Sequence, residues 1–306
     1  MKELVENNYD LKVIGFIKVT EKVYKIKSDK CFYYLKFCDD NHLDDIIDYI
    51  QSVHLKCFVD IIKNKKECYV TEYLDKYFYI MEELLQSSSC LKEIKIKNYF
   101  EMLSYIHKHS CYNLKVNKEY FKKIYNDISK VINERIYYYD SLMSEYEIKK
   151  YKSPSQWLFI LNYYRLYNSL HESIGYLKRY MLHVENSHII RVSLIYKNFN
   201  YNHIFLKNRR LISLDKIQID LPIFDIYDIY QRLPDILFDL DCFSDSYLSM
   251  IQLNEDEILL LSTLLKITPI ISFDNDEISN IIKISRLLYY IDSINSLCSY
   301  LDKKKV

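Results

Sequence analysis

The chain opens with three short runs in which apolar and polar residues alternate. The runs LKVIGFIKV, KVYKIKS and CFYYLKF lie within residues 11–37 and are rich in β-branched and aromatic side chains. Polar breaks separate them at residues 20–21 and 28–30. Alternation of this kind over short stretches is typical of strands with one buried face. We therefore predict a three-stranded antiparallel meander.

The hydrophobic period then changes. After a polar start at residues 39–41, the segment HLDDIIDYIQSVHL repeats its apolar residues at helical spacing. Two strand-like segments follow, ECYVTEYL and YFYIMEEL, joined at residues 75–76. The first 84 residues therefore predict the order β-β-β-α-β-β, which is the order of a kinase amino-terminal lobe.

From Leu91 onward the pattern is mostly helical. Ile96, Phe100, Leu103 and Ile106 form one apolar stripe, and long patterned stretches cover residues 118–150 and 155–183.

Three strand-like segments, SLIYK, HIFLK and RLISLDK, interrupt the helical pattern, with a turn at residues 208–209 between the last two. Helical patterns resume near Phe224. We predict an α+β protein with a two-lobed, protein-kinase-like fold. Its small antiparallel-sheet N-lobe would span residues 1–84, and its large helical C-lobe residues 85–306, with a hairpin near 194–216.

Composition excludes several classes of protein. Lysine plus arginine and aspartate plus glutamate each number 42, so the chain lacks the basic excess of a dedicated nucleic-acid binder. The start, MKELVENN, has no apolar signal-peptide core, and no apolar run approaches the roughly 20 residues that span a bilayer. We expect a cytoplasmic protein with no nucleic-acid partner and no membrane span.

The cysteines form no C-x-x-C pair, so neither a zinc knuckle nor a disulfide framework is indicated. Buried free thiols are the simplest interpretation. The eight cysteines are Cys31, Cys38, Cys57, Cys68, Cys90, Cys111, Cys242 and Cys298.

Five segments carry a resemblance to a known superfamily. They are VYKIKSDKCFYYLKF, YFYIMEELL, FEMLSYIHKHS, IYKNFNYNHIFLKNRRLISLDKIQIDLPIFDIYDIYQR and LNEDEILLLSTLLKITP. The fourth is similar to a catalytic segment that typically reads H-G-D-x-x-x-x-N-I-L, a hairpin, I-D-F/W and P-x-x-D-L. The chain resembles the aminoglycoside phosphotransferase and choline kinase superfamily, and within it the spore-coat kinase-like proteins of the CotS type.

The resemblance implies roles for particular residues. Lys36 takes the place of the lysine that grips the nucleotide phosphates, although a solvated strand lysine is the simpler interpretation of that residue alone. Backbone groups around Glu82, Glu83 and Leu84 take the place of the hinge that contacts adenine. Asp215 matches the metal-binding aspartate.

Other positions match the superfamily's structural residues. Pro222, Asp225 and Ile226 correspond to the motif that follows the metal-binding aspartate, and His107 corresponds to a helix position that we interpret as structural. Asn254 would be a good N-cap for the helix that follows it.

The chain departs from the superfamily at the positions that carry chemistry. The H-G-D motif reads Tyr196-Lys197-Asn198, so the position of the general base holds an amide that cannot take a proton at neutral pH. The magnesium-binding asparagine falls on His203, a poor ligand for a hard cation. Asn202, one step earlier, would restore the amide only in a shifted register.

The turn at residues 19–22 has no glycine to bring amides close to phosphate. No glutamate that could pair with Lys36 is identifiable, because the candidate helix offers only the shorter Asp44, Asp45 and Asp48.

Three hypotheses follow. The first is a catalytically degenerate kinase-fold protein with a structural or interaction role, whose partners are other proteins, among them spore-coat components, and which needs no cofactor. The second is a divergent phosphotransferase that uses ATP and magnesium on a small hydroxylated metabolite. The third is a nucleotide sensor without turnover. The 32 tyrosines would suit cross-linking in a coat, but an AT-rich coding background explains them equally well.

Overall fold

The computed structural model describes residues 1–29, 31–39, 41–85, 91–232, 240 and 242–303. The chain folds as two compact units, each assembled from three stretches. The first unit comprises Met1–Cys111, Ser193–Asp220 and Cys242–Met250, and the second Tyr112–Val192, Leu221–Asp241 and Ile251–Val306. The predicted lobe boundary between residues 84 and 85 stays a prediction.

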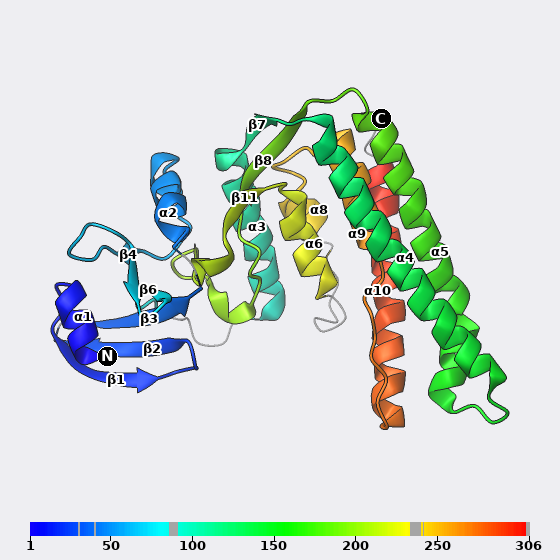
Figure 1. The fold of residues 1–306 in the computed structure, drawn as a ribbon, viewed down its shortest axis with the longest axis horizontal. Helices are drawn as coiled ribbons and strands as arrows, with labels where there is room; N and C mark the ends of the chain where they lie inside the picture. Colours follow the sequence, from blue (N-terminus) through cyan, green and yellow to red (C-terminus); the bar gives the residue numbers. More distant parts are fainter. Residues whose placement is uncertain (30, 40, 86–90, 233–239, 241, 304–306) are drawn as a thin grey trace. The chain divides into compact units, whose positions relative to one another are not determined.

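A six-stranded antiparallel sheet forms the start of the first unit (Figure 1). The strands follow the order β1-β2-β3-β6-β4, and β5 also pairs with β6. The predicted meander is confirmed, and so are the helix after it and the two later strands. The elements are α1 (Lys2–Asn8), β1 (Val13–Lys18), β2 (Val23–Ser28), β3 (Phe32–Cys38), α2 (Leu43–Ser52), β4 (Ile61–Ile62), β5 (Val70–Tyr73) and β6 (Lys76–Glu82).

The predicted order β-β-β-α-β-β was incomplete, because α1 precedes the meander and the two-residue strand β4 precedes β5. α1 is seven residues long, too short for a periodic pattern to stand out. Its Val5 packs with Val13, Ile26, Leu35 and Phe78 in one buried cluster. Tertiary packing therefore holds a helix that would be marginal in isolation.

Helix α3 (Lys92–Ser110) continues the first unit, and the apolar stripe predicted on it is fully buried. His107 is 1% exposed. Its Nδ1 lies 2.8 Å from the hydroxyl of Tyr247, in the turn that follows α8 (Cys242–Ser246). This contact supports the structural interpretation of His107.

The segment that carries the resemblance is less regular than predicted. SLIYK lies mostly within β8 (Ile189–Ile195), but HIFLK and RLISLDK each contribute only two strand residues. The remainder forms 3-10 turns, and Arg209 closes the hairpin with a left-handed φ of 49°. The elements are η1 (Tyr201–His203), β9 (Ile204–Phe205), β10 (Arg210–Leu211), η2 (Leu214–Lys216) and β11 (Gln218–Asp220).

The second unit is helical (Figure 1). Two helices of 31 residues, α4 and α5, run side by side, and α9 and α10 pack against α5. A capping box at Ser153 and Gln156 starts α5, and the predicted N-cap Asn254 starts α9. The elements are β7 (Tyr112–Lys115), α4 (Lys118–Ile148), α5 (Pro154–Val184), α6 (Ile223–Gln231), α9 (Glu255–Lys266) and α10 (Glu277–Lys303).

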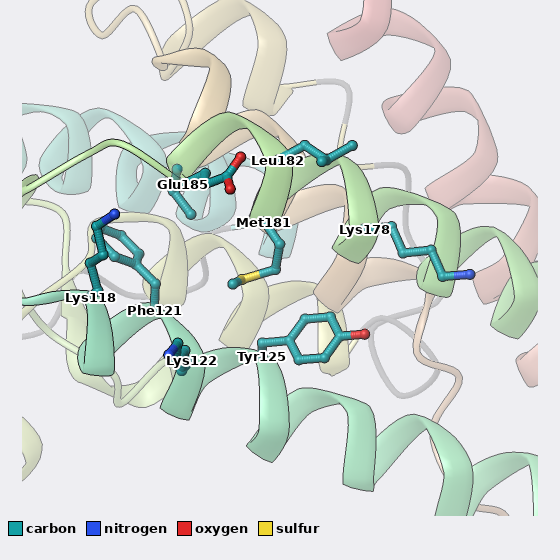
Figure 2. Close-up of a pocket in the computed structure, with 9 residues that line it drawn as sticks. Lys118, Phe121, Lys122, Tyr125, Lys178, Met181, Leu182 and Glu185 are labelled. Atoms are coloured by element: carbon teal, nitrogen blue, oxygen red, sulfur yellow. The ribbon is translucent and has the colours of Figure 1, made fainter.

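A groove of about 670 Å³ lies between the first turns of α4 and the last turns of α5 (Figure 2). Phe121 and Val184 give it a buried apolar floor, and Lys118, Lys122 and Lys178 on its edge are exposed. The groove therefore combines apolar surface with solvated cations.

Among the described residues, six cysteines are free thiols. Cys38, Cys57 and Cys298 are buried, so the prediction of buried thiols holds for them, but Cys31, Cys68 and Cys111 are exposed, so it was wrong for these three. Cys90 and Cys242 have side chains outside the described set. Within the described helices, none has the length and apolar character needed to cross a membrane.

Candidate active site

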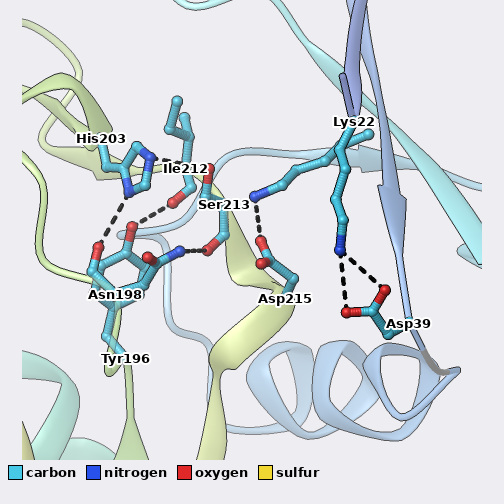
Figure 3. A network of polar contacts seen from close by, with 9 residues as sticks. Lys22, Asp39, Tyr196, Asn198, His203, Ile212, Ser213 and Asp215 are labelled. Atoms are coloured by element: carbon cyan, nitrogen blue, oxygen red, sulfur yellow. Dashed lines mark hydrogen bonds and ion pairs between the residues drawn. The ribbon is translucent and has the colours of Figure 1, made fainter. Parts of the chain in front are cut away.

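The two charged residues singled out by the resemblance lie together. Lys36 is in the middle of β3, where its neighbours across the sheet are Val23 of β2 and Tyr79 of β6. Asp215 lies in η2, and its carboxylate accepts a hydrogen bond from the Lys36 ammonium (Figure 3). The side chains are only 13% and 23% exposed, so solvent screens this ion pair weakly.

The aspartates of α2 do not supply the partner for Lys36. Asp44 Oδ1 accepts hydrogen bonds from the backbone N–H groups of Tyr69 and Val70, at 2.6 and 3.2 Å. This carboxylate therefore joins α2 to the start of β5. Lys36 pairs with Asp215 instead, across 179 positions of sequence.

Burial raises the pKa of the Tyr79 hydroxyl well above its ordinary value, and the nearby Asp215 charge raises it further. Tyr79 is fully buried, and it lies on β6 directly across the sheet from Lys36. It therefore contributes a neutral phenol, not a charge, to the surroundings of the pair.

Asn198, which the resemblance matches to the general base, contacts the backbone of the segment that precedes Asp215. Its Nδ2 donates to the backbone oxygen of Ser213 at 2.9 Å (Figure 3). The hydroxyl of Tyr196 donates to the neighbouring backbone oxygen of Ile212. Both side chains therefore bind the backbone just before Asp215.

His203, which the resemblance matches to the magnesium-binding asparagine, is engaged at both ring nitrogens. Its Nδ1 lies 3.1 Å from the backbone oxygen of Asn198, and its Nε2 lies 3.3 Å from Ser213 Oγ. A carbonyl oxygen only accepts, so Nδ1 donates to it, and in the neutral imidazole Nε2 then accepts from the serine hydroxyl. Asn202 is exposed, and its backbone N–H donates to Asn200 Oδ1.

Lys197 occupies the glycine position of the motif, and its backbone takes the left-handed conformation that glycine favours, with φ of 53°. Ser213 is also left-handed, with φ of 64°. Non-glycine residues in this region are costly by about 1–3 kcal/mol each and persist where surrounding contacts enforce them. The bonds from Asn198 and His203 to Ser213 are such contacts.

The turn between β1 and β2 forms hydrogen bonds within its own backbone. The N–H groups of Val19 and Thr20 both donate to the backbone oxygen of Val23, at 3.0 and 3.1 Å. Lys22 Nζ lies 3.0 Å from Asp39, and the pKa of Lys22 is raised, chiefly by its hydrogen bond with this carboxylate. These two amides of the turn therefore point into the hairpin.

The polar groups of the predicted hinge form hydrogen bonds and an ion pair with other residues of the same unit. The N–H groups of Glu82 and Glu83 donate to the backbone oxygens of Asp60 and Phe32, both at 3.2 Å. Glu83 Oε1 lies 2.5 Å from Lys25 Nζ. Leu84 follows β6 and is half-buried.

These residues do not fit a magnesium–nucleotide centre. Magnesium takes oxygen ligands, and the one carboxylate among the three positions, Asp215, is paired with Lys36. His203 presents an imidazole, and Asn198 presents an amide whose Nδ2 is bound to Ser213, so its oxygen is the single neutral oxygen ligand beside Asp215. No group of three or more His, Cys, Asp or Glu side chains that could hold a metal occurs within the part of the chain that the structure describes.

Comparison with solved structures identifies the architecture. An aminoglycoside phosphotransferase from Alicyclobacillus acidocaldarius matches with a TM-score of 0.71 and 11% identity, over 99% of this chain and 96% of that one. The chain has the fold of the aminoglycoside phosphotransferases. The predicted fold class, an antiparallel-sheet N-lobe with a helical C-lobe, is confirmed.

A second phosphotransferase shares this fold. Spectinomycin phosphotransferase APH(9)-Ia, in complex with ADP and spectinomycin, matches with a TM-score of 0.54 and 12% identity, over 96% of each chain. Its AMP-bound complex matches with a TM-score of 0.55 and 13% identity, over 99% of this chain and 92% of that one. No protein-family model and no curated protein matches the sequence.

Sequence reasoning missed three participants in the site. Ser213 was unremarked, yet it contacts both Asn198 and His203. Lys22 and Asp39 form an ion pair that no local pattern signals, because 17 positions separate them. Their positions at the ends of two predicted neighbouring strands could have indicated that they lie close together.

Proposed function

We propose that this protein is a kinase-fold pseudoenzyme that acts by binding other proteins and does not transfer phosphoryl groups efficiently. The observation that carries the proposal is the state of Asn198. The residue at the base position cannot take a proton, and its amide is committed to the backbone of Ser213 at 2.9 Å. Loss of a general base costs about 10²- to 10⁴-fold in rate.

The role in protein binding rests on the resemblance to CotS-type proteins, which also implies association with a spore coat and assembly from the cytoplasm. It has its own test. Antibody detection in coat extracts, compared with the cytoplasmic fraction of the same cells, should find the protein enriched in the coat. Detection only in the cytoplasmic fraction would contradict the coat assignment and leave the pseudoenzyme proposal unaffected.

One observation favours the second function, a divergent phosphotransferase acting on a small hydroxylated metabolite. Lys36 and Asp215 are both retained, and they lie in contact. The spectinomycin phosphotransferase of the same fold was solved with ADP and with AMP. In an active protein Lys36 would leave Asp215 for phosphate, and Asp215 would turn to magnesium.

Thermal unfolding with ATP separates the functions, because a ligand that binds the native state raises Tm. We expect no magnesium-dependent rise in Tm and no phosphate release from ATP. A magnesium-dependent rise that disappears in Asp215→Ala, together with phosphate release, would overturn the pseudoenzyme proposal. A saturable rise that needs no magnesium, without product, would indicate the nucleotide sensor.

A further inference from the structure

A surface pocket of about 440 Å³ lies in the helical unit, and Gly175 of α5 lines it. Glycine destabilises the interior of a helix relative to alanine. This chain has only two glycines, and a Cβ built on Gly175 would meet no atom within 4 Å. The packing of the protein therefore gives no reason for glycine at this position, whereas a ligand in the pocket would.

A buried cation also lines the pocket. Lys266, in the last turn of α9, is 4% exposed. Its Nζ donates to the Glu172 carboxylate and, at 2.5 Å, to Asn295 Oδ1. An ammonium group has three N–H bonds, so one donor remains beyond these two contacts. Burying a charged donor without full pairing is costly, so an acceptor in the pocket would stabilise it.

The other polar groups of the pocket are donors as well. Lysine only donates, so Asn295 turns its oxygen toward Lys266, and its amide N–H groups are left to donate. Arg179 lies with its guanidinium carbon 4.2 Å from the centre of the Tyr176 ring, and Ser299 adds a hydroxyl. Among the residues that line the pocket, the two cations Lys266 and Arg179 outnumber the single carboxylate of Glu172. The Asp302 carboxylate lies outside the lining and accepts a hydrogen bond from the Tyr176 hydroxyl.

We propose that this pocket binds a small organic oxyanion, a metabolite whose phosphate or carboxylate group accepts hydrogen bonds from Lys266, Asn295 and Arg179. Multiple donors with an excess of positive charge are the arrangement that recognises such groups. The volume lies within the range of small-molecule sites. The groove between α4 and α5 (Figure 2) lacks this arrangement, because it has no buried cation such as Lys266 among its lining residues and its floor is apolar.

The test measures Tm as inorganic phosphate or succinate is added, with sodium chloride at matched ionic strength as the reference. We expect a saturable rise with at least one of the two anions beyond the effect of chloride. A rise with phosphate alone identifies a phosphate ester as the ligand class, and a rise with succinate alone identifies a carboxylate. No rise with either anion overturns the proposal.

Substitutions locate the effect. Arg179→Ala should abolish the rise, and Lys178→Ala, which removes the neighbouring exposed cation, should retain it. Gly175→Ala should raise Tm without anion, because alanine favours the helix, and should weaken the response. Gly175→Leu, which fills the pocket, should abolish it. A rise that survives both Arg179→Ala and Gly175→Leu overturns the proposal.

The outcome is independent of the kinase-like site. A stabilising effect of ATP that arises in this pocket would persist in Asp215→Ala and vanish in Arg179→Ala. An effect that arises at the Lys36–Asp215 pair would show the opposite dependence.

Discussion

The contact between Lys36 and Asp215 is the residue-level feature on which the candidate site depends. Both side chains are largely buried, so removing one partner leaves the other charge poorly solvated. We expect Lys36→Met and Asp215→Asn each to lower the free energy of unfolding by about 1–3 kcal/mol. Urea unfolding of both variants and of the double variant checks this.

The double variant should lose less stability than the sum of the single variants, because it leaves no unpaired charge. A coupling of about 0.5–3 kcal/mol is expected for residues in direct contact. Strictly additive losses would mean that the ion pair is not formed in solution.

A second prediction concerns the side chain of Asn198. Asp cannot donate to the Ser213 carbonyl that Asn198 Nδ2 contacts, so Asn198→Asp would bring a carboxylate against an acceptor oxygen. We expect the free energy of unfolding to fall by about 1–3 kcal/mol. Asn126→Asp, an exposed position on α4, is the matched control and should change stability little.

The same variant also tests catalysis. Under the pseudoenzyme proposal, Asn198→Asp gains no ATP hydrolysis, because His203 remains tied to the loop and offers magnesium no oxygen ligand. Measurable phosphate release from this variant, at unchanged stability, would favour the divergent phosphotransferase.

Between elements, Glu277 joins the start of α10 to the start of α5. Its carboxylate accepts from the backbone N–H and the hydroxyl of Ser155, at 2.5 and 2.9 Å. The hydrogen bond from this backbone N–H lowers the pKa of Glu277 below its ordinary value of 4.5. A lowered pKa in the folded state contributes stability above the unfolded value and loses it as pH falls through the folded value.

We therefore expect wild-type Tm to fall below about pH 4.5, and Glu277→Gln to show a smaller fall over the same range. Asp274, whose pKa its hydrogen bond with Lys283 lowers, has the same sign, so some acid sensitivity persists. Glu134→Gln, at an exposed position on α4, should follow the wild-type curve. Coincident curves for wild type and Glu277→Gln would contradict the assignment.

Elements with a strong period could be predicted from sequence, and elements held by tertiary contacts could not. The meander and the helices α3, α4 and α5 have clear periods, because each buries one face over many residues. α1 and β4 are short, and distant residues stabilise them: Val5 of α1 packs on Phe78, and β4 pairs with β6.

The candidate site divides in the same way. The sequence alone could indicate which positions to consider, because their order along the chain resembles a known pattern. These positions are Lys36, Asn198, His203 and Asp215. Their contacts could not be named, because the hydrogen bonds to Ser213 depend on a left-handed backbone there, and serine gives no sequence signal for that conformation.

For the whole molecule, the division of the chain into two compact units raises the question whether they unfold together or separately. Each unit is built from three separate stretches, so neither is a continuous piece. Strand β8 is itself divided: its residues Ile189–Val192 pair with β7, and its residues Ser193–Ile195 pair with β11. Loss of either pairing removes support from the same strand, which favours cooperative unfolding.

The single tryptophan makes this cooperativity measurable, because Trp157 lies in α5 of the helical unit. Leu35→Ala removes a fully buried side chain from the sheet of the other unit and should cost about 2–5 kcal/mol. If the units unfold together, this substitution lowers the midpoint seen by Trp157 fluorescence as much as the midpoint seen by circular dichroism.

Leu177→Ala, in the buried face of α5, is the reciprocal variant and should shift both midpoints in the same way. A fluorescence midpoint that stays at the wild-type value in Leu35→Ala, beside a circular dichroism curve with two steps, would mean that the units unfold separately. In that case the pairing of β8 with β7 would not stabilise its pairing with β11. Loss of the Lys36–Asp215 ion pair would then lower the stability of the first unit alone.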